Sequence, residues 1–371
     1  MENEIAISSM PAETHLAEWF GPVLDHGARW CAPNLKTRCY FLKVDGFELP
    51  LTVNEAEWEN SWVCSPYTHY VTYAQEEVRR AVSPGLGVPF AALLEGVGGW
   101  FRAAECNRVV MVNNWLMSTN PWPAWNGRSL SATLDRLKAR WPSHALVFRT
   151  LNARESGPLM EALRAAGARL IPSRQVWWYD PGSIAVKRSR DVRKDAALLN
   201  RGDLERVDHE DLSESDFPSL QALYEDLYLR KYSQHNPRYS VDWLLHLWRG
   251  RNLRFTALRH PDGHFVGVEA CGPIHRTMVS PIVGYDLSLP ASLGLYRRLA
   301  VLPILAAREQ GLPLNLSAGV GRFKAHRGGE PVMEYLAVVD RHLPLARQLP
   351  WRFIEVLSRG VLAPVVKHWR L

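Results

Sequence analysis

The chain has 371 residues, of which 47% are apolar and 22% charged, and its formal net charge is +6. This length predicts more than one domain of roughly 100–200 residues, and the composition excludes an intrinsically disordered chain. A modest positive charge suits polyanionic partners.

The five cysteines are scattered and form no CxxC pair, so they predict neither a metal site nor a redox motif. Scattered cysteines are typical of a reducing compartment. The opening residues, MENEIAISSM, lack the basic-then-apolar pattern of a signal peptide. The sequence contains no apolar run of about 20 residues, which a transmembrane helix would need. We therefore expect a cytoplasmic protein without membrane insertion.

The first half is predicted to begin with a hairpin and to go on with alternating strands and helices. Asp45 and Gly46 separate two apolar runs, which is a strong hairpin signal. Ser129 is placed to cap one helix, and Gly167 ends another. The predicted elements are strands over 38–44, 47–53 and 108–119, a helix over 130–142, a strand over 145–151, a helix over 153–168 and a strand over 169–179.

A stretch rich in Lys and Arg, residues 180–203, is interpreted as the crossover between domains. We therefore expect domains over 1–185 and 186–371. The second half is predicted to repeat the order of elements, as in a duplicated domain. Its elements are strands over 253–260, 264–274 and 276–286, a helix over 293–311, a strand over 313–319, a short helix over 320–329 and a strand over 331–339.

The order from Leu253 to Val339 resembles that of the GNAT acyltransferases, and most closely the FemAB-like branch, which joins two GNAT domains in one chain. The resemblance is carried by GYDLSLPASLGLYRRL, by AAREQGLPLNLSAGVGRFKAHRGGEPVMEYLAVV, and within it by the pair Phe323 and Lys324. It implies a mixed α/β protein of two tandem GNAT-like domains, the first degenerate and the second catalytic. It also implies an enzyme without a tightly bound cofactor.

The loop that would hold the donor departs from the GNAT pattern. GNAT enzymes usually place a basic, glycine-rich turn at a helix start, where backbone N–H groups bind the pyrophosphate of acetyl-CoA. Here the loop from Leu287 to Gly294 has one late glycine and no leading basic residue, although Ser292 could act as a cap. The resemblance therefore leaves acyl-CoA, an acyl carrier protein and aminoacyl-tRNA open as donors.

Acyl transfer to an amine needs a group that accepts the amine proton and groups that polarise the carbonyl or protonate the leaving group. Two carboxylates are candidates for the base: Asp286 at the end of a central strand, and Glu269 on a strand of small and apolar residues. The alternative readings are a helix cap for Asp286 and a solvent-facing position for Glu269. Tyr285, Tyr296 and Tyr335 could orient the substrate or protonate the leaving group.

A second set of residues could hold anions or the acceptor. Arg322, Lys324, His326 and Arg327 form a basic cluster that could contact a phosphate or carboxylate, or simply be a solvated turn. An aromatic–basic run resembles nucleic-acid-binding surfaces, or could equally be a helix end that carries substrate contacts. A group of first-half residues could line an acceptor cleft between the domains, with core packing as the alternative. The run comprises Tyr228, Arg230, Lys231, Tyr232 and His235, and the first-half group comprises Asn113, Asn114, Trp115 and Trp125.

The resemblance, together with these residues, implies an N-acyltransferase that moves an acyl group from a thioester, on CoA or an acyl carrier protein, to the amine of a small molecule in a bacterial-type biosynthetic pathway. Two alternatives remain open. One is an aminoacyl-tRNA-dependent aminoacyltransferase with a peptidoglycan or peptide acceptor. The other is an inactive GNAT-like binding protein.

Overall fold

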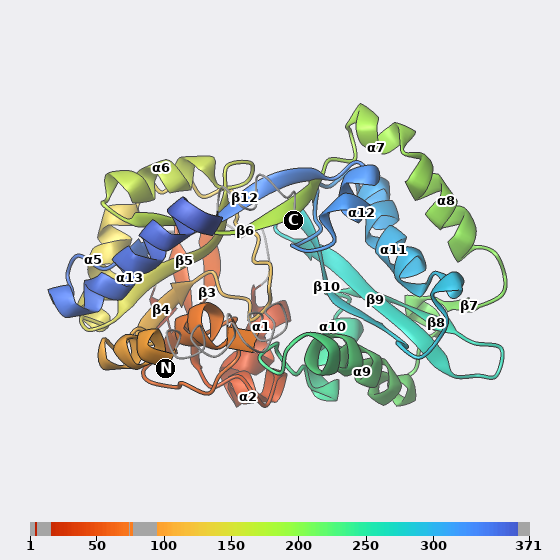
Figure 1. Ribbon diagram of the computed structural model, residues 1–371, viewed down its shortest axis with the longest axis horizontal. Helices are drawn as coiled ribbons and strands as arrows, with labels where there is room; N and C mark the ends of the chain where they lie inside the picture. The colour runs from red at the N-terminus through yellow and green to blue at the C-terminus, as the bar shows by residue number, and fades with distance from the viewer. Residues whose placement is uncertain (1–3, 6–15, 74, 77–94, 363–371) are drawn as a thin grey trace, which may run out of the picture. The chain divides into compact units, whose positions relative to one another are not determined.

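The computed structural model describes residues 4–5, 16–73, 75–76 and 95–362 of the chain (Figure 1). They form two compact units. Unit 1 contains the described residues up to Arg174, the short stretch His235–Pro237 and the described residues from Met333 onwards, whereas unit 2 contains Gln175–Gln234 and Arg238–Val332. Both units combine helices with a β-sheet, which confirms the expected mixed α/β class.

Unit 1 is built on strands in the order β1-β2-β3-β4-β5-β12. Its elements, with the part of β12 that belongs to it, are β1 (Glu4–Ile5), α1 (Leu16–His26), α2 (Ala28–Cys31), β2 (Arg38–Val44), β3 (Phe47–Asn54), η1 (Thr68–Thr72), β4 (Val109–Val112), α5 (Leu130–Arg140), β5 (Ala145–Asn152), α6 (Gly157–Ala165), the start of β6 (Arg169–Tyr179), β12 (Glu330–Val339), α13 (Leu345–Leu357) and η6 (Ser358–Leu362).

The expected first hairpin is confirmed, since β2 and β3 pair antiparallel around Asp45 and Gly46. Both turn residues have positive φ, 48° and 87°, as this tight turn requires. Ser129 lies at the N-cap position of α5, but its side chain makes no cap hydrogen bond. Its hydroxyl instead donates to the carboxylate of Asp45, so this serine ties the hairpin turn to the start of α5.

Residue alternation along β4 and β5 gives unit 1 an apolar core on each face of its sheet. Val110 and Phe148 pack with residues of α5 and α6 on one face. Met111 and Val147 pack on the other face, with Trp351 of α13. The strand expected over 108–119 is shorter, because β4 ends at Val112 and Asn113 adopts a φ of 57°, outside the strand region.

Unit 2 has the strand order β6-β11-β10-β9-β8-β7. Besides the end of β6 and the start of β12, its elements are α7 (Ile184–Arg188), α8 (Arg190–Leu199), β7 (Glu205–Val207), η2 (His209–Asp211), η3 (Glu214–Asp216), α9 (Phe217–Glu225), η4 (Asp226–Tyr232), α10 (Val241–Arg249), β8 (Arg254–Arg259), β9 (Phe265–Ile274), β10 (Thr277–Tyr285), η5 (Ala291–Leu293), α11 (Leu295–Gln310), β11 (Leu314–Asn315) and α12 (Gly321–His326).

The order predicted for the second half is confirmed by the run β8, β9, β10, α11, β11, α12 and β12. The grouping of these elements, however, differs from a division at residue 185. The later part of β12 pairs with β5, from Glu334 opposite Asn152 to Val339 opposite Leu146, within unit 1. Conversely, the end of β6 pairs with β11 within unit 2. A strand's own residue pattern does not specify its neighbour. The sequence therefore could not reveal that β12 pairs within unit 1 and β6 within unit 2.

A buried carboxylate connects three helices of unit 2. Asp195 of α8 is 0% exposed and binds Arg297 of α11 and Arg327, which follows α12. Each of its oxygens accepts from one guanidinium, with Nε–O distances of 2.7 Å to Arg297 and 2.6 Å to Arg327. Figure 1 shows α8 alongside α11, the arrangement that this pairing holds.

We predict that Asp195→Asn destabilises the protein by about 3–5 kcal/mol, because it leaves the buried Arg327 cation without its counter-charge. Urea denaturation of the purified variant measures the loss. Asp191→Asn, on the same helix but partly exposed and 3.8 Å from His326, is the matched control and should change stability by less than about 0.5 kcal/mol. Equal losses in both variants would contradict a special role for the buried pair.

Candidate functional site

The parallel strands β10 and β11 of unit 2 pair only where they begin. Met278 lies opposite Leu314 and Val279 opposite Asn315. Beyond these pairs β10 continues to Tyr285, and among the described strands it pairs there with β9 alone. The register on β9 shifts between Val279 and Ile282, and a bulge of this kind bends the strand. The carboxyl end of β10 therefore leaves β11, and in open α/β sheets ligands bind beyond such strand ends.

Gly284 allows a helix to approach this strand end closely. A Cβ on Gly284 would lie 2.4 Å from the backbone nitrogen of Tyr224 and 2.7 Å from the carbonyl oxygen of Leu223, both in α9. Only glycine permits such an approach. The π-helical turn η4 continues directly from α9, so the same contact places η4 near the end of β10.

Aromatic side chains from three elements and a lysine from a fourth gather at this strand end. Tyr285 of β10 and Tyr296 of α11 have ring centroids 6.1 Å apart, and Tyr296 lies 4.9 Å from Phe323 of α12. From η4, Lys231 places its Nζ 5.9 Å from the centre of the Tyr285 ring. Burial, followed by the nearby Tyr228 and other tyrosines, raises the pKa of Tyr296, and burial raises that of Tyr285. Both phenols therefore remain protonated at neutral pH. We call Lys231, Tyr285, Tyr296 and Phe323 the strand-end cluster.

Asp286 follows Tyr285 directly and holds one defined orientation. Its Oδ1 accepts hydrogen bonds from the backbone N–H of Ser288 at 2.8 Å and from the Ser288 hydroxyl at 2.6 Å. Its Oδ2 accepts no hydrogen bond from the described residues. The carboxylate thus stabilises a turn rather than capping a helix, since Pro290 and Gly294 hold the next N-cap positions, and its Oδ2 remains uncommitted.

Glu269, the other candidate base, lies in the sheet of unit 2 and is 1% exposed. Its Oε1 accepts a hydrogen bond from the Ser280 hydroxyl at 2.7 Å, and the Cys271 thiol also bonds to it. Burial raises the pKa of Glu269 to about 8. The side chain is therefore largely protonated at pH 7, and the solvent-facing reading is wrong.

Two cations of the predicted basic cluster are committed to structural contacts. Lys324 donates from Nζ to three carbonyl oxygens, of Leu316, Ser317 and Ala318, at 2.6–3.2 Å. Arg327 is paired with Asp195 and donates to the Phe323 carbonyl at 2.8 Å. Their expected role as anion ligands therefore needs correction, because burial gives both cations partners within the protein. Arg322 and His326 are exposed.

The loop before α11 also differs from expectation. Ser292 lies exposed in the short turn η5, and Gly294, with a φ of 63°, occupies the N-cap position of α11 without a side-chain cap. The N–H groups of Leu295, Tyr296 and Arg297 donate to no backbone carbonyl among the described residues. Free N–H groups in a first helical turn, with the helix dipole, attract anions.

Other predicted residues separate from one another. His235 belongs to unit 1, where its Nε2 lies 3.3 Å from Glu76, whereas the π-helical turn η4 belongs to unit 2. The first-half group is buried, as core packing predicts. Asn113 donates to the Pro121 carbonyl at 2.8 Å and Asn114 to that of Val63 at 3.0 Å. These asparagines therefore stabilise a loop rather than line an acceptor cleft.

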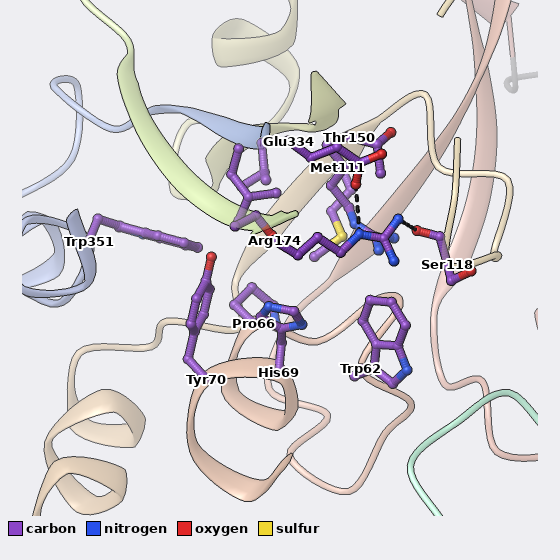
Figure 2. Close-up of a pocket in the computed structure, with 14 residues that line it drawn as sticks. Trp62, Pro66, His69, Tyr70, Met111, Ser118, Thr150, Arg174, Glu334 and Trp351 are labelled. Atoms are coloured by element: carbon purple, nitrogen blue, oxygen red, sulfur yellow. Dashed lines mark hydrogen bonds and ion pairs between the residues drawn. The ribbon is translucent and has the colours of Figure 1, made fainter. Parts of the chain in front are cut away.

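Sequence reasoning missed a pocket in unit 1 (Figure 2). It lies where β4 ends and β5 continues, on the sheet face that carries Met111 and Val147. Figure 2 shows Arg174 extended across it, with bonds to Glu334 and Ser118. The residues that line this pocket come from segments far apart in the sequence, so no local motif predicts it.

No family model and no curated protein matches the chain. Among solved structures, L-PGS from Bacillus licheniformis is similar at 16% identity over 62% of this chain and 79% of that chain, with a TM-score of 0.45. FemX is similar at 9% identity over 62% and 80%, with a TM-score of 0.46. A tandem GNAT protein from the clavulanic acid biosynthesis pathway is similar at 15% identity over 62% and 74%, with a TM-score of 0.38. At this level of similarity, support for a function has to come from the chain's own residues.

The described part of the chain contains no helix long and apolar enough to cross a membrane. Within the same residues, no group of three or more His, Cys, Asp or Glu side chains is arranged to hold a metal ion.

Glu269 predicts a pH-dependent stability. Because burial raises its pKa from 4.5 to about 8 on folding, the native state binds the extra proton, and stability falls as the pH rises through this window. Each unit of the difference is worth roughly 1.4 kcal/mol. Glu269→Gln, which keeps an acceptor for Ser280 but cannot ionise, should gain stability relative to the native protein between pH 5 and pH 8. Urea denaturation at both pH values measures this difference, and parallel pH profiles would contradict it.

Proposed function

We propose that this chain is an N-acyltransferase whose chemistry takes place at the carboxyl end of β10 in unit 2. The observation that carries the proposal is the departure of β10 from β11 after Val279. It leaves β10 without a β11 partner near Tyr285 and Asp286, and the uncapped first turn of α11 follows them in the chain. Polar side chains, aromatic side chains and free backbone N–H groups thus occur at the carboxyl end of β10.

The proposed donor is an acyl thioester carried on CoA or on the phosphopantetheine arm of an acyl carrier protein. Both donors carry phosphate groups, and the free N–H groups of Leu295, Tyr296 and Arg297 are suited to bind one. Lys231, which is exposed on η4, adds a cation 5.9 Å from the centre of the Tyr285 ring. This arrangement replaces the glycine-rich basic loop that the sequence lacks.

The proposed reaction is direct transfer to a small-molecule amine. The amine nitrogen attacks the thioester carbonyl, a C–N bond forms and the C–S bond breaks. Oδ2 of Asp286 accepts the proton that the amine loses, directly or through one water molecule. The Tyr285 hydroxyl, which has no hydrogen-bond partner among the described residues, gives its proton to the departing thiolate and recovers one from solvent. Glu269 is less suited to be the base at neutral pH, because burial keeps it largely protonated.

We predict that Asp286→Ala lowers kcat/KM by about 10²–10⁴-fold, the usual contribution of general acid–base catalysis. Tyr285→Phe should lower kcat more than it raises KM. The assay is the intact mass of a panel of amines incubated with the protein and with acyl-CoA, acyl carrier protein or aminoacyl-tRNA. Asp262→Ala, which removes an exposed carboxylate in the turn between β8 and β9, is the control and should leave the rate unchanged. Undiminished turnover in Asp286→Ala would remove Asp286 from the mechanism.

A second candidate, aminoacyl-tRNA-dependent transfer, is favoured by the surface of η4. Tyr232 is 41% exposed there, and its neighbours Arg230 and Lys231 are exposed too. Exposed aromatic and basic side chains bind single-stranded nucleic acid by stacking and charge. In the donor panel, a mass gain with aminoacyl-tRNA alone, abolished by ribonuclease, would select this candidate. Donor binding without any mass gain would select the inactive binding protein.

A further inference from the structure

The pocket of unit 1 contains a buried cation with unused donors. Arg149 of β5 is 5% exposed. Its Nη1 donates to the Val63 carbonyl and, at 2.9 Å, to Oδ1 of Asn114. Its Nε and Nη2 donate to no group among the described residues. Burial lowers the pKa of Arg149 to about 10, so the guanidinium remains charged at neutral pH.

The other ionisable groups of the pocket only partly offset this charge, because one carboxylate, Glu334, acts on both Arg149 and Arg174. Glu334 is paired with Arg174, whose Nε lies 2.6 Å from Oε2 of the carboxylate. Burial, together with the two arginines, lowers the pKa of His69 to about 3, so this ring is neutral at physiological pH. Among the ionisable residues that line the pocket, one positive charge therefore remains without a counter-ion.

A hydroxyl donor is available in the same pocket. The oxygen of Tyr70 is buried and has no hydrogen-bond partner, and burial keeps the phenol protonated by raising its pKa. Burying a polar group without a partner is costly, so a ligand that accepts this hydrogen bond would be stabilised. Figure 2 shows the side chains of Trp62, His69 and Tyr70 on the same side of Arg174.

The size of the pocket limits which ligands it can hold. Its free volume is about 30 Å³, enough for one or two water molecules or for a compact planar group. Apolar walls from Met111, Leu336 and Trp351 border it. A guanidinium binds a carboxylate through two parallel hydrogen bonds, and a carboxylate is smaller than a tetrahedral phosphate.

We propose that this pocket binds the carboxylate group of a small aliphatic acid, held by Nε and Nη2 of Arg149 and by the hydroxyl of Tyr70. The site lies wholly within unit 1, and its assignment does not depend on acyl transfer. Asn114 and Val63 fix the guanidinium from the side opposite its free donors, and the Trp62 ring, 5.5 Å from Cζ of Arg149, packs against it.

The test is a titration of the full chain, without any acyl donor, by ligand-observed NMR. Propionate should bind saturably, and propionamide, which has the same shape without the charge, should bind at least about tenfold more weakly. Phosphate should bind more weakly than propionate. Equal binding of the amide, phosphate binding as tight as that of propionate, or no saturable binding of propionate would overturn the proposal.

Variants then assign the binding to these residues. Arg149→Met should weaken propionate binding at least about tenfold. Tyr70→Phe, which removes only an unpartnered hydroxyl and should fold normally, should weaken it about threefold or more. Arg128→Ala, an exposed arginine of unit 1 outside the pocket, should bind as the native protein does. Native affinity in Tyr70→Phe together with native affinity in folded Arg149→Met would overturn the assignment.

Discussion

The candidate sites of both units depend on one constraint: in each unit a short strand of a parallel pair ends while its longer partner continues. A chain that leaves a ladder must satisfy its N–H and C=O groups elsewhere. In unit 1, β4 ends at Val112, and the amides of Asn113 and Asn114 hold the chain that follows by bonding to backbone carbonyls. In unit 2, Asp286 and Ser288 turn the chain after β10. Both departures leave side chains at the strand ends without a neighbouring strand to cover them.

Local signals in the sequence predicted most of the elements. The Asp-Gly turns at Asp45 and Asp262 specify hairpins because the following glycines take positive φ at no steric cost. Gly311 ends α11 for the same reason, with a φ of 65°. Such local signals do not identify which strands pair with one another. β12 lies in the second half of the sequence but pairs with β5. The residues of β12 do not indicate this pairing partner.

The site was predicted less well, because burial decides what a charged side chain can do. From the sequence, Lys324 and Arg327 were anion ligands as plausible as Arg322. In the structure the first two are buried and bond to carbonyl oxygens or to Asp195, so their positive charges stabilise the fold. Arg149 shows the converse. No motif marks it, yet it is buried beside Asn114 with part of its guanidinium unused, and this is why we propose it as the cation that binds a ligand in unit 1.

The same principle separates the two carboxylates considered as the base. Glu269 and Asp286 differ little as isolated acids, but one lies inside the sheet and the other in the turn that follows it. Burial favours the neutral form of Glu269, which can donate or share hydrogen bonds but cannot accept an amine proton. Asp286 keeps one oxygen fixed by Ser288 and the other free. Because the environment of an acid decides the role it can take, we propose Asp286 rather than Glu269 for the proton-accepting role.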